Sequence, residues 1–510
     1  MASSQLCVSI GRTRHKMMQT EIHEAAKRGA QLIELRLDFL AKAPDFKRLL
    51  LEKPCPLIAA VRRQQDGGRW SGTEEQRQML LRQIIVGGFD WVDLETDIAD
   101  AIRRFGNVKR IISYHNFRET PQNLEEIYAG MCKQDPDVIK IAVKAEWPAD
   151  NLRVLELVKA SQTPTVAHCM GDLGIPSRIL GAKFGAPFAY CAFNKERELA
   201  PGMLSFDEMV NVYHYDKINA DTKVYGVIGD PIGHSLSPLL HNTAFRRMNL
   251  NCVYVPFRVP REYSLGQFVG AFDKLPVYGY SVTIPHKEAA ATIAHQKDEF
   301  VELTKAANTL VRRGEGVWSA YNTDCSAAIE AMQQGLAQLD MAPQLNGRAV
   351  LVLGAGGAAR AIAHALQREK AQVTIANRDP KRAHGLAEEV GCKYTDWSAR
   401  HSVVCEMVVN ATSVGMHPNV DESPLHPSFL RSGLIVFDAV YNPETTLFIK
   451  EARERDCRVL TGVEMFVRQA SEQFWHFTGQ ELSLDELRKI VRRALSPLRY
   501  SEEEDEKQAG

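Results

Sequence analysis

The chain has 510 residues, with 62 Lys and Arg against 63 Asp and Glu, and a formal net charge of −1. This length exceeds what one hydrophobic core supports and predicts two or three domains. The balanced charge, without a basic patch, argues against a nucleic-acid partner. No apolar run reaches the roughly 18 residues that a membrane-spanning helix needs, which argues against a membrane protein.

The cysteines and the two ends of the chain indicate a cytoplasmic protein. Ten cysteines are scattered without Cys-x-x-Cys pairs or Cys/His clusters, which indicates reduced thiols and gives no metal-binding motif. The first strand-like run begins near Leu6, so we expect no targeting peptide. The acidic, polar end at residues 499–510 is expected to be disordered.

Residues 1–200 alternate apolar, β-branched runs with stretches of helical spacing. The runs lie at residues 6–10, 32–37, 57–61, 91–94, 110–114, 138–143, 165–167 and 188–192. Stretches such as 73–85 and 151–160 have helical spacing. Eight strands that alternate with helices predict a parallel sheet closed into a (β/α)8 barrel, over residues 1–216.

A single lysine, Lys140, interrupts the sixth apolar run. Alternation along a strand places Lys140 on one face and Ile139, Ile141 and Val143 on the other. The wholly apolar face should meet the helices, so we expect Lys140 to point into the barrel. An apolar setting disfavours the charged form of an amine, which would make Lys140 a nucleophile for a ketone.

Further charged side chains fall near the carboxyl ends of the predicted strands, where barrel enzymes carry their chemistry. They are Glu34, Arg36, Arg62, Glu95, His115 and, after the loop 171–174, Arg178. Each of them alone is more commonly a structural residue, in an ion pair or as a satisfied histidine. Their convergence with an inward lysine favours an active site.

Together these residues make the first part of the chain, about residues 5–215, resemble type I 3-dehydroquinate dehydratase. The resemblance rests on Glu-Leu-Arg-Leu-Asp (34–38), Asp-Leu-Glu (93–95), Ser-Tyr-His-Asn-Phe (113–117), Lys-Ile-Ala (140–142), Ser-Arg (177–178) and Ala-Pro-Gly (200–202). It implies that Lys140 forms an imine with the substrate ketone. His115 would take the neighbouring proton and later protonate the leaving hydroxyl, with Glu95 orienting His115. The resemblance implies substrate-binding roles, without a metal, for Ser9, Glu34, Arg36, Arg62 and Arg178.

The sequence departs from the family pattern at the lid of this site. The lid reads Leu199-Ala200-Pro201-Gly202-Met203, where the family has Ser or Thr first and Gln last, and Ala60 stands where the family usually has Thr. Two polar substrate contacts are thus absent from the lid, and each neutral hydrogen bond contributes about 0.5–1.5 kcal/mol. We expect a weakened KM, with the chemistry of Lys140 intact.

The rest of the chain contains two further α/β patterns. A polar stretch at 216–222 marks a boundary, and a new pattern begins at Val224. The next begins at Gly347, with strand runs at 349–353, 372–376, 407–409, 434–437 and 458–460 and a helix at 359–368. It predicts a doubly wound nucleotide-binding domain. We expect a substrate-binding domain at 223–325, a Rossmann domain at 326–460, and C-terminal helices at 461–498 that pack back on the substrate-binding domain.

Four motifs make residues 223–495 resemble shikimate dehydrogenase. They are Ser-Leu-Ser-Pro (235–238), Thr-Ile-Pro-His-Lys (283–287), Ala-Asn-Thr-Leu (307–310) and Asn-Thr-Asp (322–324). The resemblance implies that Lys287 donates a proton as the ketone is reduced and that Asp324 keeps this lysine ionised and placed. It implies that the substrate is held by Ser235, Ser237, Thr283, Asn308, Asp324, Tyr441 and Gln469.

A glycine loop, Gly354-Ala355-Gly356-Gly357-Ala358, follows a predicted strand and opens a predicted helix. In that context its backbone N–H groups are suited to a dinucleotide pyrophosphate. At the end of the next strand, Asn377, Arg378 and Arg382 favour a 2′-phosphate and therefore NADP, although Asp379 leaves use of NAD open. The resemblance places Thr412 and Gly462 near the nicotinamide.

The two resemblances support each other, because the product of the dehydratase is the ketone that the dehydrogenase reduces. We expect one enzyme that dehydrates 3-dehydroquinate and then reduces 3-dehydroshikimate to shikimate with NADPH. Its partners are small molecules, with no nucleic acid and no membrane, and the sequence does not give its oligomeric state. Two alternatives stay open: the second half is a quinate dehydrogenase that uses NAD, or the barrel is a binding module without catalysis.

Overall fold

The computed structural model describes residues 4–233 and 235–496. The chain forms two compact units, residues 1–277 and 278–510, and each is considered by itself. The expected tail at 499–510 lies outside the described residues. Within the described ranges, no helix is both long enough and apolar enough to cross a membrane.

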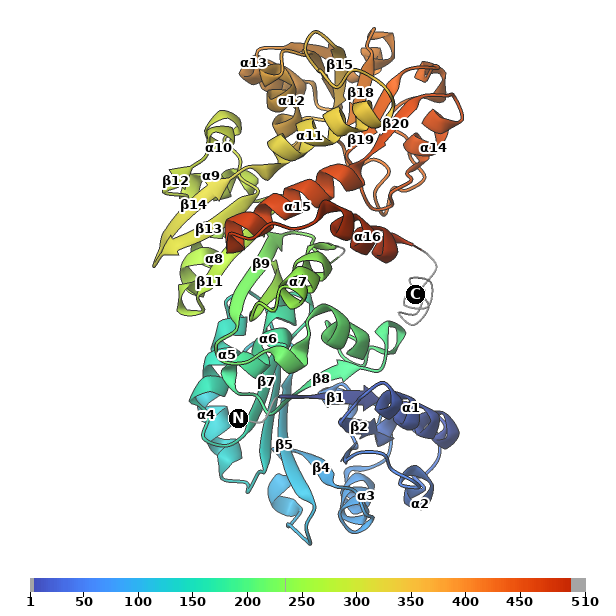
Figure 1. Ribbon diagram of the computed structural model, residues 1–510. Helices are drawn as coiled ribbons and strands as arrows, with labels where there is room; N and C mark the ends of the chain where they lie inside the picture. Colours follow the sequence, from blue (N-terminus) through green and yellow to red (C-terminus); the bar gives the residue numbers. More distant parts are fainter. Residues whose placement is uncertain (1–3, 234, 497–510) are drawn as a thin grey trace. The chain divides into compact units, whose positions relative to one another are not determined.

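The first unit contains the predicted barrel, whose eight strands are all parallel (Figure 1). The strands are β1 (Gln5–Ile10), β2 (Leu32–Arg36), β3 (Leu57–Ala60), β4 (Trp91–Glu95), β5 (Lys109–Asn116), β6 (Val138–Lys144), β7 (Thr165–Met170) and β8 (Phe188–Ala192). Their order is β7-β6-β5-β4-β3-β2-β1-β8, so the barrel is nearly closed and its seam lies between β7 and β8.

Helices between the strands follow the predicted rhythm. They are α1 (His15–Lys27), α2 (Phe46–Leu49), α3 (Glu74–Val86), α4 (Leu124–Cys132), α5 (Asp150–Ala160) and α6 (Ile175–Leu180). The start of α3 is fixed by a capping box, in which Thr73 and Gln76 each accept a hydrogen bond from the backbone N–H of the other.

The inward positions of the barrel change from apolar to charged along the strands. An apolar cluster is formed by Cys7, Leu32, Ile58, Ile111, Val138, Val166, Phe188 and Tyr190. Because side chains alternate between faces, the next inward positions on β2, β4 and β6 are Glu34, Asp93 and Lys140. Charged groups therefore gather toward the carboxyl ends of the strands, above an apolar floor.

The first unit also contains β9 (Lys223–Gly229) and β10 (Cys252–Arg258), which pair in parallel. Helix α7 (Ser237–Arg247) lies between them in the sequence, and α8 (Leu265–Ala271) follows β10. Asn242 on α7 fixes this helix to β10, because its side chain donates to the carbonyl of Tyr254 at 2.9 Å and accepts from its N–H at 2.7 Å.

The second unit begins with a small, mainly antiparallel group of strands. Strand β13 (Thr309–Gly314) pairs antiparallel with β11 (Val277–Val282) and with β14 (Val317–Tyr321), and β12 (Gln296–Lys297) pairs in parallel with β14. The helices of this part are α9 (Lys287–Ile293), α10 (Glu299–Thr304) and α11 (Thr323–Gln338).

The remainder of the second unit is the predicted doubly wound domain. Its parallel sheet has the order β17-β16-β15-β18-β19-β20, with the crossover next to β15 that is typical of dinucleotide-binding folds. The strands are β15 (Ala349–Leu353), β16 (Gln372–Asn377), β17 (Lys393–Asp396), β18 (Met407–Asn410), β19 (Ile435–Asp438) and β20 (Arg458–Thr461). The helices are α12 (Gly357–Arg368), α13 (Pro380–Val390), α14 (Leu447–Arg453), α15 (Gly462–Thr478) and α16 (Leu484–Leu495).

Candidate active sites

A pocket of about 470 Å³ opens at the carboxyl ends of the barrel strands. It brings together seven of the eight barrel residues predicted from the sequence, namely Ser9, Glu34, Arg36, Arg62, His115, Lys140 and Arg178. The eighth, Glu95, does not line the pocket but is buried behind Arg62. The lid residues Leu199, Ala200 and Met203 also line it.

Lys140 points into the barrel, as predicted from the alternation of β6. Its Nζ atom lies 3.0 Å from Oε1 of Glu34 and 3.2 Å from Oδ2 of Asp93, and 3.8 Å from the ring centroid of Tyr190. The expected apolar setting is therefore wrong. The apolar neighbours along β6 face the helices, whereas the barrel interior surrounds the ammonium with two carboxylates.

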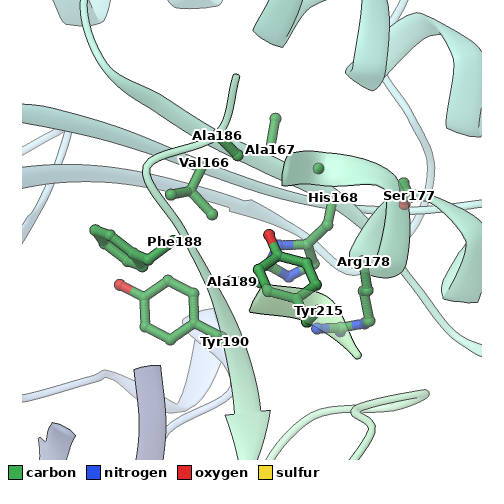
Figure 2. A pocket seen from close by; sticks show the side chains of 11 residues that line it. Val166, Ala167, His168, Ser177, Arg178, Ala186, Phe188, Ala189, Tyr190 and Tyr215 are labelled. Carbon is green, nitrogen blue, oxygen red and sulfur yellow. The ribbon is translucent and has the colours of Figure 1, made fainter. Parts of the chain in front are cut away.

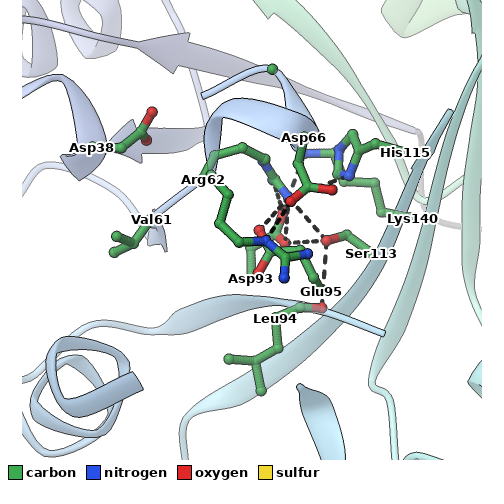
Figure 3. Close-up of polar contacts among 12 residues, drawn as sticks. Asp38, Val61, Arg62, Asp66, Asp93, Leu94, Glu95, Ser113, His115 and Lys140 are labelled. Carbon is green, nitrogen blue, oxygen red and sulfur yellow. Dashed lines mark hydrogen bonds and ion pairs between the residues drawn. The ribbon is translucent and has the colours of Figure 1, made fainter. Parts of the chain in front are cut away.

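Arg62 is the centre of a buried polar network (Figure 3). It donates to Asp93 at 2.6 Å, to Glu95 at 3.2 Å and to Oγ of Ser113 at 3.0 Å. Burial raises the pKa of Asp93, but the charges of Arg62 and Lys140 outweigh burial and lower it overall. The same balance lowers the pKa of Glu34. Both carboxylates are thus held ionised beside the lysine.

Glu95 was expected to orient His115, but it is bound by two arginines instead. Its two oxygens accept hydrogen bonds from Arg77 at 2.6 Å and from Arg62 at 3.2 Å, and no contact with His115 occurs among the described residues. The histidine instead has Nδ1 3.5 Å from Nη1 of Arg62. Glu95 therefore acts on His115 at most through Arg62.

His115 is a neutral imidazole in this setting. Its burial, followed by the nearby charges of Arg62 and Lys140, lowers its pKa well below 6.5. A neutral imidazole has a free lone pair at physiological pH, so the ring is able to accept a proton.

Arg178 is the guanidinium of this pocket that has no ion pair in the described part of the chain. Nη2 donates to the carbonyl of Pro201 at 3.3 Å, while its buried Nε has no partner. Burial lowers the pKa of Arg178 to about 10. In contrast, Arg36 is held by Asp38 through two bonds of 2.9 and 2.8 Å, and Ser9 donates to Glu34 at 2.8 Å.

Sequence reasoning missed three inward residues of this site: Asp93, Ser113 and His168. Asp93 binds Lys140 and Arg62, and Ser113 donates to Asp93 at 2.6 Å. The alternation of side chains along a strand could have identified them, because each lies two positions from another inward residue on its strand. Their partners depend on pairing between strands, which the sequence does not display.

In the second unit, Lys287 and Asp324 form the predicted pair, with Nζ 2.6 Å from Oδ2. Lys287 is the first residue of α9, and Asp324 lies in the first turn of α11. The N-cap Asn322 accepts a hydrogen bond from the backbone of Asp324 at 3.3 Å. This places Asp324 at the positive end of the α11 dipole.

Other predicted substrate residues lie in the same unit, within local networks. Asn308 exchanges two hydrogen bonds with Thr323, at 2.9 and 3.0 Å. The ring of Tyr441 stacks on Phe466 at 4.0 Å, and the side chain of Gln469 donates to the carbonyl of Phe466 at 3.0 Å. The remaining residue, Thr283, accepts from the N–H of His286 through its carbonyl oxygen at 2.9 Å.

Ser235 and Ser237 belong to the first unit. Ser237 is the first residue of α7, and its N–H donates to Oγ of Ser235 at 3.2 Å.

The glycine loop joins β15 to α12, as the sequence predicted. Gly354 has φ +116°, and a Cβ there would lie 2.8 Å from the carbonyl oxygen of Ala411. A Cβ on Gly357 would lie 3.2 Å from Cδ of Lys287, so the loop lies close to this lysine. The N-terminus of a 12-residue helix fits a pyrophosphate, and it lies against the predicted proton donor.

The end of β16 presents two exposed guanidiniums, Arg378 and Arg382. Asp379 is the N-cap of α13 and accepts from the backbone N–H of Lys381 and Arg382, at 3.0 and 3.4 Å. Asn377 donates to the carbonyl of Asp379 at 3.1 Å. Asp379 also lies 3.7 Å from Arg382, but Arg378, Lys381 and Arg382 outnumber this one acid, so the exposed charge at this end is net positive and fits a 2′-phosphate.

Two further residues predicted near the nicotinamide lie where the backbone is tightly packed, Thr412 after β18 and Gly462 at the start of α15. Thr412 donates from Oγ1 to Oδ1 of Asn410 at 2.6 Å. A Cβ on Gly462 would lie 2.6 and 2.7 Å from the carbonyl oxygens of Ala439 and Val440, so only glycine fits there without movement.

Family models match three parts of the chain: type I 3-dehydroquinase at 6–220, the shikimate dehydrogenase substrate binding domain at 227–310, and shikimate / quinate 5-dehydrogenase at 335–424. The bifunctional 3-dehydroquinate dehydratase/shikimate dehydrogenase of Arabidopsis thaliana chloroplasts is 36% identical over 498 residues, which are 93% of this chain and 82% of that protein. The chain belongs to the bifunctional 3-dehydroquinate dehydratase/shikimate dehydrogenase family. Both resemblances inferred from the sequence are confirmed.

Other relatives of this bifunctional family member match its second part. A shikimate dehydrogenase (NADP(+)) of Methanosarcina mazei is 38% identical over 283 residues, 54% of this chain and 99% of that protein. A crystal structure of shikimate dehydrogenase in complex with NADP⁺ has a TM-score of 0.51 and 32% identity, covering 55% of this chain and 98% of that one. The predicted fold class, a barrel followed by a shikimate dehydrogenase-like part, is confirmed.

Proposed function

We propose that this enzyme dehydrates 3-dehydroquinate through a Schiff base on Lys140 and reduces the resulting 3-dehydroshikimate to shikimate with NADPH. The observation that carries the proposal is a pair of lysine sites, one in each unit. Lys140 lies with the neutral His115 in one pocket of the barrel, and Lys287 is paired with Asp324 against the glycine loop.

In the dehydratase site, Lys140 first gives up a proton, for which Glu34 and Asp93 are within hydrogen-bond distance. Its amine then attacks the substrate ketone, and loss of water gives an iminium ion whose charge the two carboxylates stabilise. The iminium acidifies the neighbouring C–H, and His115 takes that proton. His115 returns it to the leaving hydroxyl, and hydrolysis of the imine frees Lys140 and the product.

In the dehydrogenase site, the ammonium of Lys287 donates a proton to the carbonyl oxygen of 3-dehydroshikimate. Asp324 holds that ammonium at 2.6 Å and balances its charge. Bound NADPH supplies the hydride. Gly354, Gly356 and Gly357 would hold its pyrophosphate, and Arg378 and Arg382 its 2′-phosphate.

The proposed substrate contacts follow from which groups are available. Arg178, which has no ion pair among residues 4–233 and 235–496, receives the substrate carboxylate in the barrel. Glu34 and Arg36 already bind Ser9, Lys140 and Asp38, so they would contact the ring hydroxyls only with their remaining hydrogen-bonding capacity. Asn308, Tyr441 and Gln469 hold the substrate beside Lys287, with Thr412 and Gly462 near the nicotinamide.

Borohydride trapping tests the first half of the proposal. The full chain is incubated with dehydroquinate and borohydride, and the digest is mapped by mass spectrometry. We expect one reduced adduct on Lys140, and none in Lys140→Met. A wild-type chain that binds dehydroquinate without forming an adduct or losing water would support the alternative, a barrel that binds without catalysis.

A second candidate for the dehydrogenase part is a quinate dehydrogenase that uses NAD, since Asp379 stands at the end of β16. The capping role of Asp379 argues against a ribose contact. Initial rates with shikimate and with quinate, each with NADP⁺ and with NAD⁺, separate the two. A higher kcat/KM for quinate with NAD⁺ would favour this second candidate.

We also propose the domain limits 1–216, 223–325, 326–460 and 461–498. Limited proteolysis that cuts between 216 and 223 supports the first limit, and cuts within the barrel strands contradict it.

We further propose a cytoplasmic location. Fractionation of cells that express the natural gene tests the location, and recovery within an organelle contradicts it.

A further inference from the structure

His168 is an inward-facing residue of β7 whose imidazole lines the dehydratase pocket. It also lines the adjoining cavity at the seam between β7 and β8, where Figure 2 shows it with Arg178, Tyr190 and Tyr215. In the described part of the chain, the ring makes no hydrogen bond and no ion pair. A polar group that is 7% exposed in such a place is costly unless water or a ligand satisfies it.

The strand register places this imidazole across the pocket from His115. Ala142 on β6 is the register partner of His115 on β5 and of His168 on β7. Neighbouring strands are about 4.8 Å apart, so the two histidines flank a gap of two strand spacings. The small side chain of Ala142 leaves that gap open, and Lys140 is the preceding inward residue of β6.

The other polar walls of the pocket are already engaged. Glu34 accepts from Ser9 and Lys140, and Arg36 is held by Asp38. The lid side presents Leu199 and Met203, which offer no strong hydrogen-bonding group. Unengaged polar capacity therefore lies at His168 on β7 and Arg178 on α6, together with the buried hydroxyl of Tyr190 on β8, which also has no partner.

The side chains of Arg178 and His168 suit two adjacent groups of one ligand. Arg178 is a cation with an unpartnered buried Nε. His168 is neutral, because burial and the charges of Arg178 and Lys140 lower its pKa well below 6.5. A neutral imidazole offers one donor and one acceptor, which suits an alcohol next to a carboxylate. In dehydroquinate, one ring carbon bears both the carboxylate and the hydroxyl that is lost as water.

We propose that His168 is a specificity-determining residue that hydrogen-bonds this hydroxyl while Arg178 binds the adjacent carboxylate. The proposal rests on the proposed dehydratase function. It assigns proton transfer to His115 and only a hydrogen bond to His168. Because the product lacks this hydroxyl, the contact favours binding of substrate over product.

The test compares His168→Leu, which removes the hydrogen bond, with His168→Gln, which keeps a donor and an acceptor. Three quantities are measured: KM for dehydroquinate, the inhibition constant of 3-dehydroshikimate without NADPH, and the dehydrogenase rate of the same chain as a control for folding. We expect His168→Leu to raise KM about three- to tenfold, the range of one neutral hydrogen bond. The inhibition constant should stay unchanged, and His168→Gln should restore most of the loss.

Equal weakening of substrate and product, or no change in KM, would overturn the proposal while leaving the dehydratase function in place. A wild-type chain without dehydratase activity would instead refute that function, and this inference with it. If the leucine variant fails to fold, as its lost dehydrogenase rate would show, His168→Met replaces it in the same comparison.

Discussion

The Nζ atom of Lys140 and the Oε1 atom of Glu34 lie 3.0 Å apart, and both side chains are buried inside the barrel. Asp93 completes a triad with them, at 3.2 Å from the same ammonium. The proposed nucleophile is therefore not an isolated amine in an apolar setting. Its charge is balanced in the resting enzyme, and the same carboxylates are in place to balance the iminium ion that replaces it.

Lys140→Met should abolish dehydration and leave reduction of 3-dehydroshikimate at the wild-type rate. The amine is the only group proposed to bond covalently with the substrate, and the second unit does not depend on it. Separate assays of the two reactions check this. Residual dehydration within about tenfold of the wild-type rate would contradict the Schiff-base mechanism, because removal of the covalent nucleophile should reduce the rate by much more than tenfold.

Arg62→Leu should destabilise the chain by about 3–5 kcal/mol, since it leaves Asp93 and Glu95 buried without their shared cation. The matched control is Arg104→Leu, which removes a more exposed guanidinium that also binds two carboxylates, Asp135 and Asp137. That change should cost about 1 kcal/mol or less. Urea denaturation measures the unfolding free energy of both variants. Equal losses of unfolding free energy would show that the buried network of Arg62 is not the cause of the destabilisation.

His115 gives the pH dependence of stability a definite sign. Its folded-state pKa is lowered by burial and by the charges of Arg62 and Lys140, so below pH 6.5 the unfolded chain binds a proton that the folded chain does not. The unfolding free energy should fall as pH drops from 7 to 5, by up to about 1.4 kcal/mol per pH unit for this group. His115→Gln should make that slope shallower, as measured by urea denaturation at several pH values. An unchanged slope would contradict a neutral buried imidazole.

Gly357→Ala should lower the rate of reduction several-fold, because its Cβ would lie 3.2 Å from Cδ of Lys287 and shift this side chain by a few tenths of an ångström. Gly385→Ala on α13 is the control, since a Cβ there meets nothing within 4 Å. Steady-state kinetics of both variants give the comparison. Equal kcat values would contradict a close approach of the loop to the proton donor.

Lys287→Ala and Asp324→Asn should each slow reduction by about 10²–10⁴-fold, the range of general acid catalysis. Dehydration should continue at the wild-type rate in both variants, because the pocket of Lys140 is built entirely within the first unit. Parallel assays on each purified variant decide this. Loss of both activities in a folded variant would refute independent sites.

The fold was largely predictable because each barrel strand is an apolar, β-branched run. Strand β17 was not predicted, since Lys393–Asp396 is polar and mostly exposed and lies at the edge of its sheet. Apolar periodicity identifies strands that are buried, and it carries no signal for one that is not.

Residue types and strand ends predicted which side chains of the barrel meet in one pocket, but not how they pair. Glu95 was expected at His115 and instead binds Arg62 and Arg77. Lys140 was expected among apolar groups and is bound by two carboxylates. Such partners depend on register and on angles across the barrel, which neighbours along the chain do not specify.

A coupled assay shows whether one chain performs the two consecutive reactions. The purified enzyme receives dehydroquinate and NADPH, and the nicotinamide absorbance is followed. We expect oxidation of NADPH that depends on dehydroquinate and disappears in Lys140→Met, although that variant still reduces added 3-dehydroshikimate. If wild-type enzyme reduces 3-dehydroshikimate but leaves NADPH unchanged with dehydroquinate, the proposal that one chain performs both reactions is wrong.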